Sequence, residues 1–156
     1  MTLLPSSPQR DEHGRVIPHD HIDVLSSDGV IRRVNPQQHV VLDPKSETGK
    51  RISSIWLSSS TGVSVDLLRP IEEDGVDARK FVTTPVYVGS VKFIASDLRT
   101  AGFKIGFDPI AKDDPIDPEN PYHGLLWGRL SSTRFKNLLA KAEWFVPIEG
   151  VALKQP

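Results

Sequence analysis

The sequence predicts an α+β protein: one domain with a mostly antiparallel sheet of five to six short strands, two or three helices, and a C-terminal helix packed on the sheet. Short apolar runs separated by turn residues indicate the strands. The link between the runs at 86–94 and 103–107 is shorter than the roughly twelve residues that a parallel crossover needs, so these two runs are expected to form an antiparallel or bent pair. An amphipathic stripe near the C-terminus predicts a helix that covers the sheet.

The strands and the shorter helices follow from local patterns. Alternating or β-branched runs predict strands at 30–34, 51–60, 86–94, 103–107 and 125–127. The run at 39–42 either extends or re-forms the first of these strands, and the run at 63–68 is a further strand or a bulged extension of 51–60. In one of them, Phe103, Ile105 and Phe107 alternate with polar or small residues, which indicates one buried and one exposed face. Short helices are expected at 77–82 and 97–101. Asp77 is the N-cap candidate of the first.

The C-terminal helix is predicted at 134–145. Its apolar side chains recur at helical spacing on one face, and they are Phe135, Leu138, Leu139, Ala142 and Phe145. Hydroxyl side chains at 131–133 precede the helix and can cap its first turn. Burying one large apolar side chain stabilises the folded state by roughly 1.5–3 kcal/mol relative to exposure. The helix is therefore expected to be structural rather than a free interaction helix.

The chain is expected to divide into an extended N-terminal arm at 1–27, the α+β domain at 28–148 and a C-terminal tail at 149–156. The arm holds three prolines and three histidines without a sustained period. His13, His19 and His21 are close enough in sequence to suggest metal binding, but a divalent ion needs at least one further ligand from elsewhere. No metal site is therefore assigned.

The composition excludes several classes of function. The 156 residues carry a formal net charge of -1 and no polybasic tract, so nucleic-acid binding is not expected. The lack of cysteine excludes disulfides, thiolate zinc sites and cysteine nucleophiles. The sequence has neither the apolar run of a signal peptide nor the roughly 18 consecutive apolar residues of a membrane span. A cytoplasmic protein without membrane contact is expected.

The stretch 53–62 has the most unusual composition in the chain, with five serines and one threonine among its ten positions. These hydroxyls form either a polar edge and turn, or a surface that hydrogen-bonds a ligand or a phosphate. The serine- and tryptophan-bearing strand, without a catalytic motif, favours a non-catalytic module that binds another protein and needs no cofactor. The candidate binding residues are Trp56, Ser58, Tyr87 and Tyr122. The oligomeric state stays open.

Several short motifs resemble those of a known family. They are Arg33-Val34-Asn35-Pro36, Arg51-Ile52-Ser53-Ser54 followed by Trp56, Val63-Ser64-Val65-Asp66, Asp108-Pro109 and Asn120-Pro121-Tyr122-His123. In this order they resemble a family of short bacterial proteins of unassigned function, over most of the chain. The resemblance carries no settled activity. It implies an accessory role in a toxin, immunity or phage-defence system.

The layout also resembles that of ADP-ribosyltransferase folds and the related RNA 2′-phosphotransferases. The matching positions are Arg33, then Ser53 and Ser54 beside Trp56, then His123. This resemblance implies an alternative function, an enzyme that uses NAD or a phosphorylated substrate, with Arg33 holding a phosphate or ribose and His123 steering the acceptor. The catalytic residues would then be Arg33, Ser53, Ser54 and His123, and these four must converge in one pocket. The sequence departs from the transferase pattern because no glutamate stands near His123 on the late strand.

Overall fold

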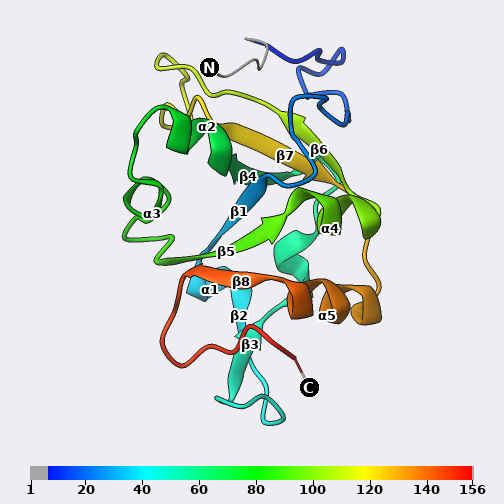
Figure 1. Cartoon of the computed structure of the whole chain (residues 1–156), viewed down its shortest axis with the longest axis vertical. Helices are drawn as coiled ribbons and strands as arrows, with labels where there is room; N and C mark the ends of the chain where they lie inside the picture. The colour runs from blue at the N-terminus through cyan, green and yellow to red at the C-terminus, as the bar shows by residue number, and fades with distance from the viewer. Residues whose placement is uncertain (1–6, 156) are drawn as a thin grey trace.

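The structure is a computed structural model that describes residues 7–155, and a six-stranded sheet forms its centre (Figure 1). The strands lie in the order β6-β7-β4-β1-β5-β8, and every neighbouring pair is antiparallel. Their bounds are Gly29–Val34 (β1), Val63–Leu67 (β4), Gly89–Ile94 (β5), Lys104–Phe107 (β6), His123–Trp127 (β7) and Glu143–Val146 (β8). The predicted α+β class with a mostly antiparallel sheet is confirmed. The expected pair of the runs at 86–94 and 103–107 is wrong, because β5 pairs with β1 and β8 while β6 pairs with β7.

The remaining elements are a small hairpin and short helices. The hairpin joins β2 (Val40–Leu42) to β3 (Lys50–Ile52) in a second, two-stranded sheet. The helices are α1 (Pro36–His39), the 3-10 helix η1 (Ser54–Leu57), α2 (Leu68–Glu73), α3 (Ala78–Phe81), α4 (Ala95–Thr100) and α5 (Ser132–Lys141). Even α5 has only 10 residues, and within residues 7–155 no helix has the length and apolarity that crossing a bilayer requires.

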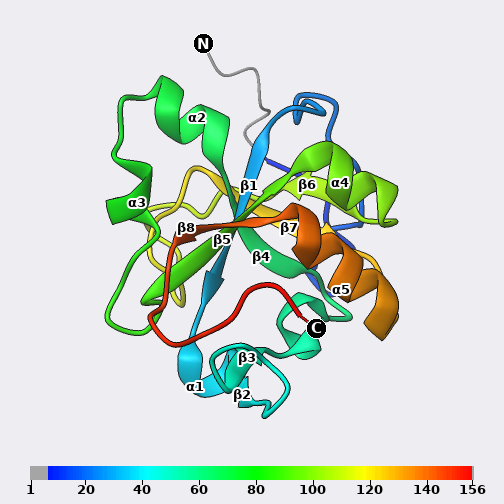
Figure 2. The same cartoon turned by 60° about the horizontal axis from the view of Figure 1, so that its bottom comes forward.

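Different elements cover the two faces of the sheet, because successive strand residues point to opposite sides. Helices α4, α5 and η1 pack on the face that holds Val30 and Phe93, and this α4–α5 face carries the main apolar core. Helices α2 and α3 cover part of the other face around Ile31, and we refer to it as the α2–α3 face. Figure 2 shows the two helix pairs on opposite sides of the sheet. The C-terminal helix packs on the sheet, as predicted.

The strand predicted at 51–60 is wrong beyond its second residue. Strand β3 ends at Ile52, and the chain turns into η1. The Ser53 side chain accepts a hydrogen bond from the N–H of Ile55 and so caps this helix. The turn carries Trp56 into the core, where it is 0 % exposed and lies beside Phe93 with ring centroids 5.8 Å apart. Burial of this large side chain overrides the local strand pattern.

The helix predicted at 134–145 ends earlier than its apolar stripe indicated. Helix α5 stops at Lys141, and residues Glu143–Val146 form β8 at the edge of the sheet. This strand pairs with β5, which would otherwise be an open edge. Phe145 is buried, but it lies in the core of the α2–α3 face rather than on the helix. The helical spacing of Phe145 is therefore coincidental.

The N-terminal arm contacts β6, the other edge strand, through its residues 19–21. The backbone N–H of His21 donates to the carbonyl of Ile105 at 2.7 Å, and the N–H of Ile105 donates to Asp20 Oδ1 at 3.1 Å. The N–H of Phe107 donates to His19 Nε2 at 3.2 Å. These contacts occupy backbone groups that an edge strand otherwise offers to another chain.

The segment 149–155 also packs against the domain. Its three central side chains are buried, and they are Val151, Ala152 and Leu153. Next to them, Lys154 Nζ donates hydrogen bonds to the carbonyls of Leu139, Ala140 and Ala142 at the end of α5. An ammonium group stabilises a helix at this position because the carbonyls there carry partial negative charge.

Candidate functional site

A cluster of polar side chains lies on the α2–α3 face, where β1, β4 and β7 run near one another. This polar cluster consists of Arg33 from β1, Ser64 and Asp66 from β4, His123 from β7, and Asp108 and Asn120 from the segment between β6 and β7. Asp66 pairs with His123 across β4 and β7. Ser64 lies two residues before Asp66 on the same strand, so both side chains point to this face.

The first part of the polar cluster is a buried ion pair between Arg33 and Asp66. Arg33 donates from Nε to Asp66 Oδ2 at 2.8 Å and from Nη2 to Oδ1 at 3.0 Å. Asn120 Nδ2 donates to the same Oδ1 at 2.8 Å. The Asp66 side chain is 3 % exposed, so these three hydrogen bonds compensate for the water that it has lost. Arg33 also lies over the Phe81 ring, 5.6 Å from its centroid.

The second part is a chain of hydrogen bonds through Ser64, His123 and Asp108. His123 Nδ1 lies 2.6 Å from the backbone carbonyl oxygen of Asp108 and 3.5 Å from its carboxylate Oδ2. Both oxygens only accept hydrogen bonds, so Nδ1 carries the proton of the neutral imidazole. Nε2 then accepts from the Ser64 hydroxyl, 3.0 Å away. A general base beside a nucleophilic serine needs this tautomer.

The electrostatics of Asp108 favour its ionised form. Burial on its own would raise the pKa of this carboxyl, but the contacts with His123 and Arg10 outweigh burial and hold the pKa below its usual range. Arg10 Nη2 donates to Asp108 Oδ1 at 2.9 Å. An ionised Asp108 next to Nδ1 stabilises positive charge on His123 when Nε2 takes up a proton.

The serine end of this chain of hydrogen bonds faces solvent. The side chains of His123 and Asp108 are 10 % and 14 % exposed, whereas Ser64 is exposed. A reactant can therefore reach the hydroxyl, while the two groups behind it are shielded from water. This arrangement is chemically suited to proton transfer from Ser64 to His123.

The structure brings together two of the four residues predicted as catalytic. Arg33 and His123 both belong to the polar cluster and share Asp66 as a neighbour. Ser53 and Ser54 lie instead at the start of η1, which packs through Trp56 on the α4–α5 face. Arg33 and the two serines are therefore on opposite sides of the sheet, and the four residues do not share one pocket.

The four residues predicted to bind a partner differ in burial and lie in different parts of the fold. Trp56 is fully buried, which makes its predicted place on a contact surface wrong. Tyr122 is 7 % exposed, and its hydroxyl donates to Asp74 Oδ2 at 2.8 Å. Ser58 is exposed at the end of η1, and Tyr87 is half-buried in the loop before β5. These four side chains do not form one surface.

Four members of the polar cluster were not predicted to be catalytic from the sequence, and two of them, Ser64 and Asp108, belong to the chain of hydrogen bonds through His123. Both stand in the motifs Val63-Ser64-Val65-Asp66 and Asp108-Pro109, but neither motif indicates chemistry by itself. Ser64 lies 59 residues before its partner His123, and Asp108 lies 15 residues before it. The antiparallel pairing of β4, β6 and β7 is what joins them.

Comparison with known proteins finds no match: no family model, no curated protein and no solved structure is similar to the chain. The described part of the chain, residues 7–155, also holds no group of three or more histidine, aspartate or glutamate side chains arranged to bind a metal ion.

Proposed function

We propose that the chain is a serine hydrolase for carboxylic esters, with Ser64 as the nucleophile, His123 as the general base and Asp108 as the residue that orients His123. The observation that carries this proposal is the hydrogen bond of 3.0 Å between Ser64 Oγ and His123 Nε2, with Asp108 on the opposite ring nitrogen. Such groups are recognised by geometry and roles rather than by sequence motif, and they recur on unrelated folds.

The proposed reaction proceeds in two steps. Ser64 Oγ attacks the carbonyl carbon of the ester while His123 Nε2 takes the hydroxyl proton. The tetrahedral intermediate collapses, the C–O bond to the alcohol breaks, and His123 returns the proton to the leaving oxygen. Water then attacks the acyl-serine with His123 again as the base, which releases the carboxylic acid and restores Ser64. General base catalysis of this kind accelerates a reaction by about 10²–10⁴-fold.

Arg33 is the proposed stabiliser of the oxyanion. Ile31 of β1 pairs with Asp66 of β4, and Arg33 and Ser64 each lie two residues away on these adjacent strands, so both side chains point to the α2–α3 face. Asp66 holds Arg33 Nε and Nη2, and within residues 7–155 Nη1 has no hydrogen-bond partner. Because Asp66 already holds the guanidinium in place, Nη1 of Arg33 needs little reorganisation when negative charge develops on the carbonyl oxygen of the ester.

The two functions predicted from the sequence stay predictions. The first is a protein-binding role in a toxin, immunity or phage-defence system, and in such a role Trp56 could not contact the partner, because its side chain is buried. The NAD- or phosphate-dependent transferase would need Ser53 and Ser54 beside Arg33, but they begin η1 on the other side of the sheet. The carboxylate of Asp66 also engages Nε and Nη2 of Arg33, so the bidentate grip that a phosphate would use is already taken.

Ester hydrolysis tests the proposal. The wild-type chain and the Ser64→Ala, His123→Gln and Ser58→Ala variants are compared in the release of p-nitrophenol from p-nitrophenyl acetate. Ser64→Ala and His123→Gln are expected to lower the rate by at least about a hundredfold, because each removes a participant in the proton transfer. Ser58→Ala deletes an exposed hydroxyl outside the polar cluster and should retain the wild-type rate.

A second measurement identifies the nucleophile directly. A fluorophosphonate that reacts with activated serines is expected to label the wild-type chain once, at Ser64, as located by peptide mass spectrometry. Circular dichroism on each variant separates loss of activity from loss of folding. Wild-type turnover by Ser64→Ala, or an adduct on any other residue, would overturn the proposal, as would a folded wild-type chain that neither reacts nor turns over.

A further inference from the structure

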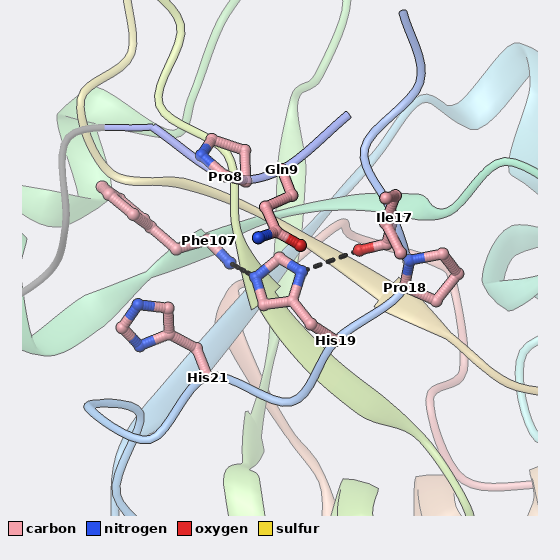
Figure 3. Close-up of a pocket in the computed structure, with 7 residues that line it drawn as sticks. All are labelled: Pro8, Gln9, Ile17, Pro18, His19, His21 and Phe107. Carbon is pink, nitrogen blue, oxygen red and sulfur yellow. Dashed lines mark hydrogen bonds between the residues drawn. The ribbon is translucent and has the colours of Figure 1, made fainter. Parts of the chain in front are cut away.

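A pocket lies between the N-terminal arm and the edge strand β6, outside the polar cluster. Its volume is about 310 Å³, and its walls include Pro8, Gln9, Pro18, His19, His21 and Phe107. Figure 3 shows His19 at the centre of the lining, with Phe107 and His21 on one side and Pro18 on the other. A cavity of this size lies at the lower end of the range for small-molecule sites.

The arm is held firmly enough to form one wall of this pocket. His19 Nε2 accepts from the N–H of Phe107 at 3.2 Å, and its Nδ1 donates to the carbonyl of Ile17 at 2.9 Å. The His19 ring also lies 5.4 Å from the Trp127 ring, centroid to centroid. Farther out, Arg10 and Val16 pair as an antiparallel bridge. The pocket is therefore built by a fixed loop and strand rather than by chance contact of mobile side chains.

His21 offers the pocket an unused hydrogen-bond donor. Its Nδ1 accepts from the N–H of Asp23 at 3.1 Å, so the proton of the neutral ring resides on Nε2. Within residues 7–155, His21 Nε2 has no hydrogen-bond partner. Burial lowers the pKa of His21, and the neighbouring His19 adds to this effect while Asp23 and Asp20 oppose it. Near neutral pH the ring is therefore a neutral donor.

We infer that this pocket binds a planar aromatic molecule that carries a hydrogen-bond acceptor, with the ring between the proline and Phe107 walls and the acceptor at His21 Nε2. The lining includes three planar rings, the imidazoles of His19 and His21 and the phenyl of Phe107, which favour a planar partner, and two proline rings add apolar surface. The donor at His21 fixes the orientation, as the few polar groups of an apolar site do. Its lining residues are distinct from those of the polar cluster, so this site does not depend on the proposed hydrolase.

Titration with small acids tests this inference. Indole-2-carboxylate is the planar probe and cyclohexanecarboxylate is its saturated counterpart, and both are followed through the ¹H–¹⁵N spectrum of the full chain. The aromatic acid is expected to shift the amides of Gln9, His21 and Phe107 and to bind about fivefold more tightly than the saturated acid. Equal affinity for the two acids, or shifts that map to another part of the chain, would overturn the inference.

Variants test the role of the imidazole donor. His21→Phe keeps a ring of similar size but removes the donor, and it should weaken binding of indole-2-carboxylate by about tenfold. His13→Phe makes the same change at an exposed position of the arm and should leave binding unchanged. Ser64→Ala should also bind normally, because Ser64 does not line the pocket. Wild-type affinity in His21→Phe, or lost binding in Ser64→Ala, would contradict the assignment.

Discussion

Acid should destabilise the fold through His39, a buried imidazole near the α4–α5 face. His39 is 9 % exposed, and its Nδ1 accepts a hydrogen bond from the N–H of Asn35 at 2.9 Å. Protonation at Nδ1 would remove this acceptor and place a charge in a site with little water. Burial, with a smaller contribution from the charge of Arg32, lowers the pKa of His39 from 6.5 to about 4.

The sign and size of the effect follow from this difference. Below pH 6.5 the unfolded chain takes up a proton on His39 that the folded chain does not. The stability of the folded chain is therefore undiminished by His39 above pH 6.5 and decreases as the pH falls toward about 4. Each pKa unit corresponds to 1.36 kcal/mol, so the free energy of unfolding should fall by about 3 kcal/mol over this range. That is a large part of the stability of a typical domain.

Urea unfolding at pH 7.5 and pH 4.5 measures this loss. His39→Asn retains an acceptor close to the position of Nδ1 but cannot take up the proton, so it should lose about 2–3 kcal/mol less than the wild type between the two pH values. Carboxylates that titrate in the same pH range affect the stability of the wild type and of His39→Asn equally, so their effect cancels in the difference between the two proteins. His13→Asn, at a side chain that is 69 % exposed, is the matched control and should behave as the wild type. Equal losses in wild type and His39→Asn would refute this reasoning.

Two further predictions concern packing around the sheet. Lys154→Met removes the hydrogen bonds to the last carbonyls of α5 and should lower the free energy of unfolding by about 1–2 kcal/mol in a urea titration. Lys136→Met, at an exposed position of the same helix, should change the free energy of unfolding little. Equal effects of the two substitutions would argue against the capping role of Lys154. Gly106→Ala places a methyl group 2.5 Å from Trp127 and 2.8 Å from His19, so thermal unfolding should show a loss of about 1–3 kcal/mol; unchanged stability would mean that the arm does not pack tightly on β6.

Local patterns predicted much of the fold because they depend on residues close in sequence. The alternation around Ile105 predicted β6, and burial of both Ile105 and Phe107 agrees with it. Asp77 was predicted to cap a short helix, and its side chain accepts from the N–H of Lys80 at 3.3 Å. Ser131 likewise accepts from the N–H of Arg134 at the start of α5. These interactions span three residues or fewer.

Other local patterns misled because a distant partner decided the structure. The apolar spacing from Phe135 to Phe145 predicted one helix, but the open edge of β5 takes residues Glu143–Val146 as a strand. The alternation at 51–60 predicted a strand, but the core takes Trp56 and the chain turns into η1. Neither β5 nor the core pocket for Trp56 can be recognised from the neighbouring residues alone.

The sequence by itself therefore determined the class of the fold, most strands of the central sheet and the apolar face of its longest helix, because each depends on a short repeating pattern. The tertiary structure alone decided that Ser64, Asp108 and His123 meet, since they come from separate strands and loops. It also decided that the N-terminal arm closes a pocket against β6. Strand pairing joins residues far apart in the chain, and the short link between β5 and β6 did not indicate that three other strands lie between them.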